Sequence, residues 1–447
     1  MVSDISGIIR STLTRAPAPH AARPHLALRT MLLRWLSRTL LTLAALLALV
    51  TAWAMWRFAS YTAPDPAVPP DAGALAYFIN DYAPAREAFV HKADALARRF
   101  GGVEQLRIPV ASAQVPGLTV DGVYVPAQRE PRRLLILLSG THGVEGPAGS
   151  AVTRLFMDEF MTSAALADTG VLLLHGMNPY GFARQRRVTE QNVDLNRNAA
   201  ASAALYLSDN AGYPLVDPLI NPRDVADTGA PAHRFFLLRA LGMLAQHGMA
   251  PLRQAVLQGQ YAEPRGIYYG GSALAPQLEA LAPTLRRIVN AYPLSMSLDL
   301  HTGYGARGHL HVFLNPPTDP RVRQGLEQVF QGHAIDWGTG QDFYTVTGDV
   351  SGWIGSLRAG GTHLPGVFEY GTMDSQGTLG AIKSLHIGVL ENQGVQHGYA
   401  SDAERERIRR DYVEMFNPSS PAWRTQVIQQ SRQLLTQVMA RLPQLGQ

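Results

Sequence analysis

The feature of this sequence that most constrains its fold is the apolar run LLILL at residues 134–138, which leads into a glycine-rich turn carrying His142 and Glu145. An unbroken aliphatic run of this length is typical of a strand buried on both faces, as in an α/β protein with parallel strands. An imidazole and a carboxylate separated by two residues at the end of such a strand can bind one divalent cation from one side. We therefore expect an α/β fold with half of a metal site at one edge of its sheet.

The remaining metal ligand must come from elsewhere in the chain, because a catalytic zinc takes three protein ligands and keeps a fourth position for water. His301 follows a second strand-like segment, residues 295–300, and would project from the same sheet edge as the first pair. His309 and His311 are the competing candidates. Asp299 either orients a ligand imidazole from behind or faces away from it.

Between the two ligand segments lie three further motifs, NPYGF at residues 178–182, RR at 186–187 and NVDLNRN at 192–198. In the order His-x-x-Glu, Asn-Pro-x-Gly, Arg, Val-Asp-Leu-Asn-Arg-Asn, His and a late Glu, the sequence resembles the zinc carboxypeptidase (M14) family. The segments SGTHGVEG and GIYYGG are most similar to its bacterial DUF2817 branch, and the resemblance covers roughly residues 75–400. It implies a three-layer α/β/α fold with a mixed central sheet.

Amide hydrolysis requires an activated water, a base and a group that stabilises the developing negative charge. The resemblance assigns His142, Glu145 and His301 to one zinc ion per chain, and Glu369 to the general base. Glu369 is also unusual on its own, because an unpaired carboxylate within the apolar segment 366–371 is costly to bury.

Arginine and asparagine side chains are expected to hold the substrate, because a guanidinium binds carboxylate oxygens through two parallel hydrogen bonds. The resemblance assigns Arg187 to the oxyanion, and Asn196 with Arg197 to a terminal carboxylate. Arg186 and Arg184 stay open as alternatives to Arg187. The resemblance also implies that the phenol of Tyr344 donates a hydrogen bond to the substrate.

Several other kinds of site are excluded. Residues 303–308 fit G-x-G-x-x-G, but residues 309–314 then alternate like a strand, whereas a nucleotide site needs a helix there. The chain has no cysteine and no G-x-S-x-G motif, which excludes thiol chemistry and a serine nucleophile elbow. The positive charge is concentrated near the N-terminus, so we expect no nucleic acid partner, and the strand-like segment after residue 308 excludes a nucleotide partner.

The N-terminal basic charge flanks an uncharged apolar segment. Residues 1–58 contain seven arginines against one aspartate, and residues 39–56 carry no charge. The uncharged stretch is just long enough to cross a bilayer, which takes about 17 to 25 apolar residues. We therefore predict a transmembrane signal anchor at residues 39–57, with the arginine-rich residues 1–38 in the cytoplasm. Cleavage near Ala54 and a true start at Met31 stay open.

The remainder is predicted to lie outside the inner membrane of a bacterium, in the periplasm or beyond. Residues 58–76 read as a stiff proline-rich stalk and residues 77–447 as one catalytic domain. An insertion at about residues 205–290 is expected to form a rim over the cleft. Helices at residues 401–442, starting with a capping box, are expected to serve packing.

These features together predict zinc-dependent hydrolysis of an amide bond next to a free carboxylate. A metallocarboxypeptidase acting on a peptide C-terminus is the favoured reading. Two alternatives stay open: an amidohydrolase of N-acyl amino acids, like the aspartoacylase relatives, and a non-catalytic binding protein with the same cleft.

Overall fold

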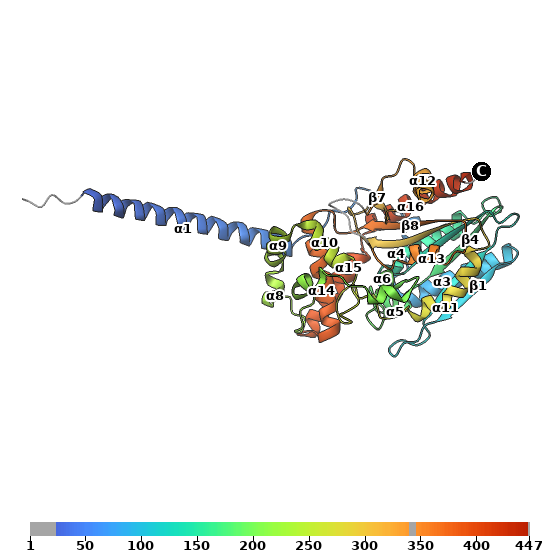
Figure 1. Ribbon diagram of the computed structural model, residues 1–447, viewed down its shortest axis with the longest axis horizontal. Coiled ribbons are helices and arrows are strands. Elements are labelled where there is room, and N and C mark those ends of the chain that lie inside the picture. Colours follow the sequence, from blue (N-terminus) through green and yellow to red (C-terminus); the bar gives the residue numbers. More distant parts are fainter. Residues whose placement is uncertain (1–23, 339–345, 446–447) are drawn as a thin grey trace, which may run out of the picture. The chain divides into compact units, whose positions relative to one another are not determined.

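The computed structural model describes residues 24–338 and 346–445, and the chain divides into two units, one ending at Ala59 and one starting at Ser60 (Figure 1). Within the described residues, the first unit is the single helix α1 (Pro24–Ala59). Its segment Arg29–Ala59 contains an 18-residue window with a mean hydropathy of 1.9 and suits a membrane span by length and composition, a test that a signal sequence also passes. The helix is longer than the predicted span because no glycine or proline interrupts it.

The second unit is built on an eight-stranded sheet of order β1-β2-β4-β3-β5-β8-β6-β7. Its centre, β4, β3, β5 and β8, is parallel, whereas β1 and β2 on one side and β6 on the other add antiparallel neighbours. The sheet is therefore mixed, as predicted. The strands are β1 (Glu104–Pro109), β2 (Thr119–Val125), β3 (Arg133–Ser139), β4 (Thr169–His175), β5 (Leu294–Gly303), β6 (Leu310–Leu314), β7 (Ile335–Trp337) and β8 (Thr362–Gly371).

Helices cover both faces of this sheet (Figure 1). Alternate side chains of β3 enter opposite cores: Leu135 and Leu137 pack with one set of helices, and Leu134 and Ile136 with the other. This alternation explains why every residue of the strand is buried. The first face carries α3 (Tyr82–Arg99), α4 (Gly146–Glu159), α12 (Pro320–Val329) and α16 (Pro421–Arg441), and the second α6 (Leu195–Asn198), α11 (Pro276–Val289) and α13 (Val350–Ser356). The three-layer α/β/α prediction is confirmed.

The other helices surround these layers. Two of the described helices begin at serine caps: Ser401 accepts a hydrogen bond from the backbone of Glu404, as in the predicted capping box, and Ser420 accepts one from the backbone of Trp423. The surrounding helices are α2 (Ala72–Leu75), α5 (Pro179–Arg184), α7 (Tyr213–Ile220), α8 (Pro231–Arg234), α9 (Phe236–His247), α10 (Met249–Leu257), α14 (Thr378–His397) and α15 (Asp402–Phe416), with short 3-10 turns η1 (Gly143–Glu145), η2 (Ala203–Leu207) and η3 (Leu442–Gln444).

Two regions differ from expectation. The insertion is shorter than the predicted residues 205–290, because α11 at its end packs on the sheet as part of the core. The proline-rich segment is not a free stalk from Ser60 onward: Asp65 forms an ion pair with Arg307 at 2.7 Å, and the Asp71 amide donates to Thr425. Prolines keep the segment extended, and these side-chain contacts fasten it to the second unit.

Candidate metal centre and active site

The turn that carries His142 and Glu145 is held by close backbone packing. β3 ends at Ser139, and Gly140 then adopts a φ of +71°, which reverses the chain direction at little steric cost. A Cβ at Gly143 would lie 2.0 Å from the carbonyl carbon of Gly181, so only glycine fits there. The glycine-rich motif is therefore what allows the two ligand side chains to be presented at the strand end.

The NPYGF motif supports this turn from the other side. Asn178 caps α5 by accepting from the Gly181 amide at 2.9 Å, and its Nδ2 donates to the Arg187 carbonyl at 3.0 Å. The Val144 amide donates to the Arg186 carbonyl at 2.9 Å. The NPYGF motif and the turn that carries the ligands are thus connected by hydrogen bonds through residues 186–187.

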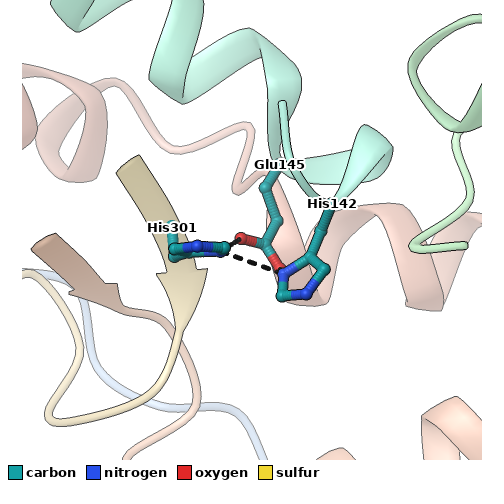
Figure 2. A group of neighbouring side chains, drawn as sticks. All are labelled: His142, Glu145 and His301. Atoms are coloured by element: carbon teal, nitrogen blue, oxygen red, sulfur yellow. Dashed lines mark hydrogen bonds and ion pairs between the residues drawn. The ribbon is translucent and has the colours of Figure 1, made fainter. Parts of the chain in front are cut away.

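His301 reaches the same point from β5, the strand next to β3. Figure 2 shows His301 at the end of its strand, pointing toward Glu145 and His142, which come from the turn before α4. The Nδ1 atoms of His301 and His142 lie 3.0 Å apart. Glu145 Oε1 lies 2.8 Å from Nδ1 of His142, and Oε2 lies 3.1 Å from Nδ1 of His301. All three ligand atoms lie within 4.8 Å of one another, and all three residues are buried.

The opposite nitrogens of both imidazoles face buried carboxylates. Nε2 of His142 lies 3.2 Å from Asp194, and Nε2 of His301 lies 2.9 Å from Asp299. Asp299 in turn accepts a hydrogen bond from Thr141 at 2.8 Å. Carboxylates behind histidine ligands are a common device that fixes which ring nitrogen is presented to a metal ion. Of the two orientations open for Asp299, it adopts the one toward His301.

The charges of this cluster call for a cation. Glu145, Asp194 and Asp299 are opposed in direct contact by one guanidinium, that of Arg187, which lies 2.9 Å from Asp194 and 3.5 Å from Glu145. The formal excess is two negative charges, which matches a divalent ion. Two convergent Nδ1 atoms and a carboxylate are also a donor set that zinc prefers, so the residues fit the expected metal.

The pKa directions agree with this picture. Burial alone would raise the pKa of Glu145, but the imidazoles of His142 and His301 hold it below its ordinary value. Burial opposes a charge on His301, yet Asp299 and Glu145 raise its pKa well above the ordinary range. Such a cluster binds positive charge, either a proton or a metal ion.

The competing third ligands lie in other surroundings. His309 is exposed, and His311 places Nδ1 2.9 Å from Asp336 while its Nε2 accepts from the Ala306 amide. Among the described residues, His142, Glu145 and His301 form the one group that could hold a metal ion.

Glu369 lies on β8 directly beside His301 in the strand register, so both side chains emerge on the same face. Burial raises the pKa of Glu369 to about 8; the nearby Glu145 also raises it, while His301 and Arg187 lower it. A carboxyl group with a raised pKa next to a metal-binding cluster is suited to taking up and releasing a proton near neutral pH.

The structure separates the two adjacent arginines. Arg187 faces Asp194 and Glu145, whereas Arg186 points away and forms a buried ion pair with Glu391 at 2.9 Å. Arg187 is therefore the one of the pair that lies beside the metal cluster.

Asn196 and Arg197 lie close by, but much of their hydrogen-bonding capacity is used internally. Asn196 Oδ1 accepts from the Val350 amide, and three N–H groups of Arg197 donate to the carbonyls of Leu257 and Asn196. A guanidinium has five N–H donors, so Arg197 keeps some for a ligand. Tyr344 lies outside the described residues.

Two neighbours of the site were not assigned a role from the sequence. Asp194 contacts both His142 and Arg187, a position that its place in NVDLNRN does not reveal by itself. Tyr268 of the GIYYGG motif has a φ of +57°, and its ring lies 5.3 Å from the Arg187 guanidinium and 5.5 Å from that of Arg197. Tyr268 thus combines a left-handed backbone, which is rare for a residue other than glycine, with contacts of its ring to two guanidinium groups. The only sign of this role in the sequence is the GIYYGG motif.

A cavity of about 260 Å³ opens beside the cluster. Arg187, Arg197, Tyr268 and Glu369 line it together with many aliphatic and methionine side chains from α7, α9, α10 and α14. The inserted helices α7, α9 and α10 thus form part of the wall of a chamber next to the site.

Fold and site define an α/β/α protein with a buried His–Glu–His cluster able to hold a metal ion. Over residues 78–430 the sequence matches the family described as "Protein of unknown function (DUF2817)". The chain belongs to this family, and the resemblance to it drawn from the sequence is confirmed. A comparison with curated proteins finds no match.

Solved structures similar to this chain include proteins named as metallopeptidases. A Shewanella amazonensis protein designated a metallopeptidase is 12% identical, with a TM-score of 0.37, covering 71% of this chain and 94% of its own. Bovine thrombin-activatable fibrinolysis inhibitor is 12% identical, with a TM-score of 0.39 and coverages of 69% and 97%. A metallo-carboxypeptidase from Burkholderia cenocepacia is 11% identical, with a TM-score of 0.36 and coverages of 71% and 70%. Similarity at this level assigns no activity, which has to follow from the residues of this chain.

Proposed function

We propose that the chain is a zinc-dependent hydrolase that cleaves an amide bond next to a free carboxylate, in the manner of a metallocarboxypeptidase. The observation that carries the proposal is the convergence of His142, Glu145 and His301 on one point, with two buried carboxylates behind the imidazoles. The membership in DUF2817 is compatible with it, because the family match includes every residue of this cluster.

The side chains divide the work as follows. His142, Glu145 and His301 would hold the ion, which when bound acidifies a water molecule and polarises the substrate carbonyl. Glu369 accepts the proton of that water and returns it to the leaving amine. Arg187 supplies positive charge where the oxyanion develops, while Asp194 fixes the position of its guanidinium. The N–H groups of Arg197 that face no carbonyl bind the substrate carboxylate, together with Asn196.

Metal analysis and product analysis test this proposal. The second unit is purified, its metal content is measured, and release of the C-terminal residue from short peptides is followed with and without a chelator. We expect about one zinc per chain, chelator-sensitive release, and loss of both in His142→Ala and His301→Ala. Asp336→Asn serves as the control, because this carboxylate contacts His311 outside the cluster. Full metal retention in both histidine variants would refute the proposed site.

The same assay separates the readings that the sequence left open. Preferred deacylation of N-acetyl amino acids over peptide cleavage would favour the amidohydrolase alternative, and metal binding without any hydrolysis would favour a binding protein.

We further propose that α1 anchors the chain in the inner membrane, with the second unit on the outer side. The apolar helix and the arginines before it support this assignment. Protease treatment of intact spheroplasts should degrade the second unit, and its complete protection would overturn the assigned orientation.

A further inference from the structure

We propose that the substrate carries a long unbranched alkyl chain, which occupies the cavity beside the metal cluster. This inference rests on the proposed amide hydrolysis and names its substrate class: an amphipathic amide that combines a carboxylate head with a hydrocarbon tail.

The cavity joins a polar site to an apolar chamber. Arg187, Tyr268 and Glu369 line it where it borders the metal cluster. Away from them, α7 contributes Val216 and Leu219, and other inserted helices and α14 add further aliphatic and methionine side chains. A ligand that fills both parts must be polar in one part and apolar in the other.

The aliphatic wall is built by amphipathic helices. On α9, Ala240, Met243 and Leu244 share one face at helical spacing, and this face borders the cavity. On α14, Ile382 and Leu385 do the same. The chamber of about 260 Å³ between these faces is partly open to solvent, and a concave, mostly apolar pocket with a few polar groups at one part is typical of a small-molecule site.

Four polar residues of this wall, Arg186, Glu391, Asn192 and Ser384, are already bonded to other protein groups. Arg186 and Glu391 neutralise each other at 2.9 Å. Asn192 donates to the carbonyls of Pro264 and Gly266, and Ser384 to that of Gly380. These contacts leave the wall suited to hydrocarbon, because a polar ligand would have to give up water without gaining these partners.

Small residues on α14 keep the chamber open. Gly388 lies in the interior of this helix, where glycine costs about 1 kcal/mol relative to alanine, and it lines the cavity. A Cβ built there would meet no atom within 4 Å. Ala381, also on the wall, lies two turns earlier on the same side of the helix.

The chain-length dependence of hydrolysis tests the proposal. Two substrate series are compared: N-acylglycines from acetyl to hexadecanoyl, and dipeptides whose C-terminal residue runs from alanine to 2-aminodecanoic acid. Burial of one methylene group changes binding by about fourfold. We expect kcat/KM to rise by about a hundredfold or more from the shortest member to the eight-carbon member of one series. The series that rises identifies the side of the amide that carries the tail.

A pair of glycine variants links this dependence to the cavity. Gly388→Leu should fill the chamber and so reduce the rise of kcat/KM with chain length. Gly242→Leu is the matched control, because a Cβ at Gly242 also meets nothing within 4 Å, but this residue of α9 does not line the cavity. Its dependence of kcat/KM on chain length should equal that of the wild type. Ala381→Leu replaces Gly388→Leu if thermal unfolding shows that the latter is not folded.

A binding measurement keeps the inference separate from the proposed activity. Calorimetry with the Glu369→Gln variant compares the longest and shortest members of each series, and in one series the long-chain compound should bind tighter by about a hundredfold or more. Chain-length independence in both series despite efficient cleavage, or equal binding of long and short compounds in both series, would overturn the alkyl-chain inference while leaving hydrolysis intact. Absence of hydrolysis with selective binding of the long chain would overturn the proposed activity and keep the chamber.

Discussion

The metal cluster and the apolar cavity lie side by side, yet they are built in opposite ways. The cluster is made of short, strongly polar contacts between residues at strand ends, such as the 2.8 Å contact of His142 with Glu145. The cavity is lined mainly by aliphatic side chains on helices inserted between β4 and β5 and on α14, which follows β8. The difference indicates that reaction type is set by the sheet and substrate type by the insertion, so changes in one region should leave the other property alone.

The largest effect is expected for the proposed base. Glu369→Gln removes the proton acceptor but keeps the shape, and should lower kcat by about 10²- to 10⁴-fold, with metal content unchanged. Steady-state kinetics on short- and long-chain substrates measure it. If the metal cluster and the cavity act independently, kcat falls equally for short- and long-chain substrates. A loss confined to long-chain substrates would show that the two regions are coupled.

The arginine pair comes next. Arg187→Gln should lower kcat by about 10²- to 10³-fold, because it removes the positive charge beside the developing oxyanion. Arg186→Gln should act mainly on folding, costing about 3 to 5 kcal/mol of unfolding free energy, because it leaves Glu391 buried without its partner. Kinetics and urea unfolding of both variants distinguish the two roles. A catalytic loss in Arg186→Gln with destabilisation in Arg187→Gln would contradict the assignment of Arg187 to the oxyanion.

Smaller effects are expected behind the ligands. Asp194→Asn and Asp299→Asn each remove a carboxylate that faces a ligand imidazole, and should weaken zinc affinity by about 10- to 100-fold. Competition with a chromogenic chelator measures this affinity. Unaltered affinity in both variants would show that these carboxylates do not orient the histidines.

The smallest effect concerns a histidine that belongs to neither region. His175 is fully buried, contacts Ser150 at 2.9 Å, and burial lowers its pKa to about 4. In the unfolded chain this imidazole binds a proton near pH 6.5, whereas in the folded chain it does so only near pH 4. The stabilisation from the buried neutral imidazole is therefore complete above pH 6.5 and is lost as the pH falls toward 4. Urea unfolding should show a loss of about 1 to 3 kcal/mol over this range, reduced in His175→Gln. The exposed His309→Gln is the control, and an unchanged slope in His175→Gln would contradict the assignment.

Much of the polar site could be predicted because its residues stand at the ends of recognisable strands. The run before His142 and the segment before His301 each read as a strand, and parallel neighbours bring their carboxyl ends together. Asp299 could not be oriented in advance, since its contact with His301 depends on the local course of β5.

The choice between Arg186 and Arg187 and the role of Asp194 depend on loop geometry that no periodicity encodes. The cavity was hidden for a different reason. The pattern of α9 and α10 reads as ordinary core packing, since an apolar helix face looks the same whether it covers a sheet or an open chamber.

The register of β8 has a consequence for any redesign of this scaffold. Glu369 stands level with His301 on one neighbouring strand and with His311 on the other. Because side chains alternate, inserting one residue within β8 would send the carboxylate into the opposite layer. An insertion in β8 would therefore have to add residues in pairs to keep the carboxylate on the side of the metal cluster, whereas the inserted helices lie outside this sheet register.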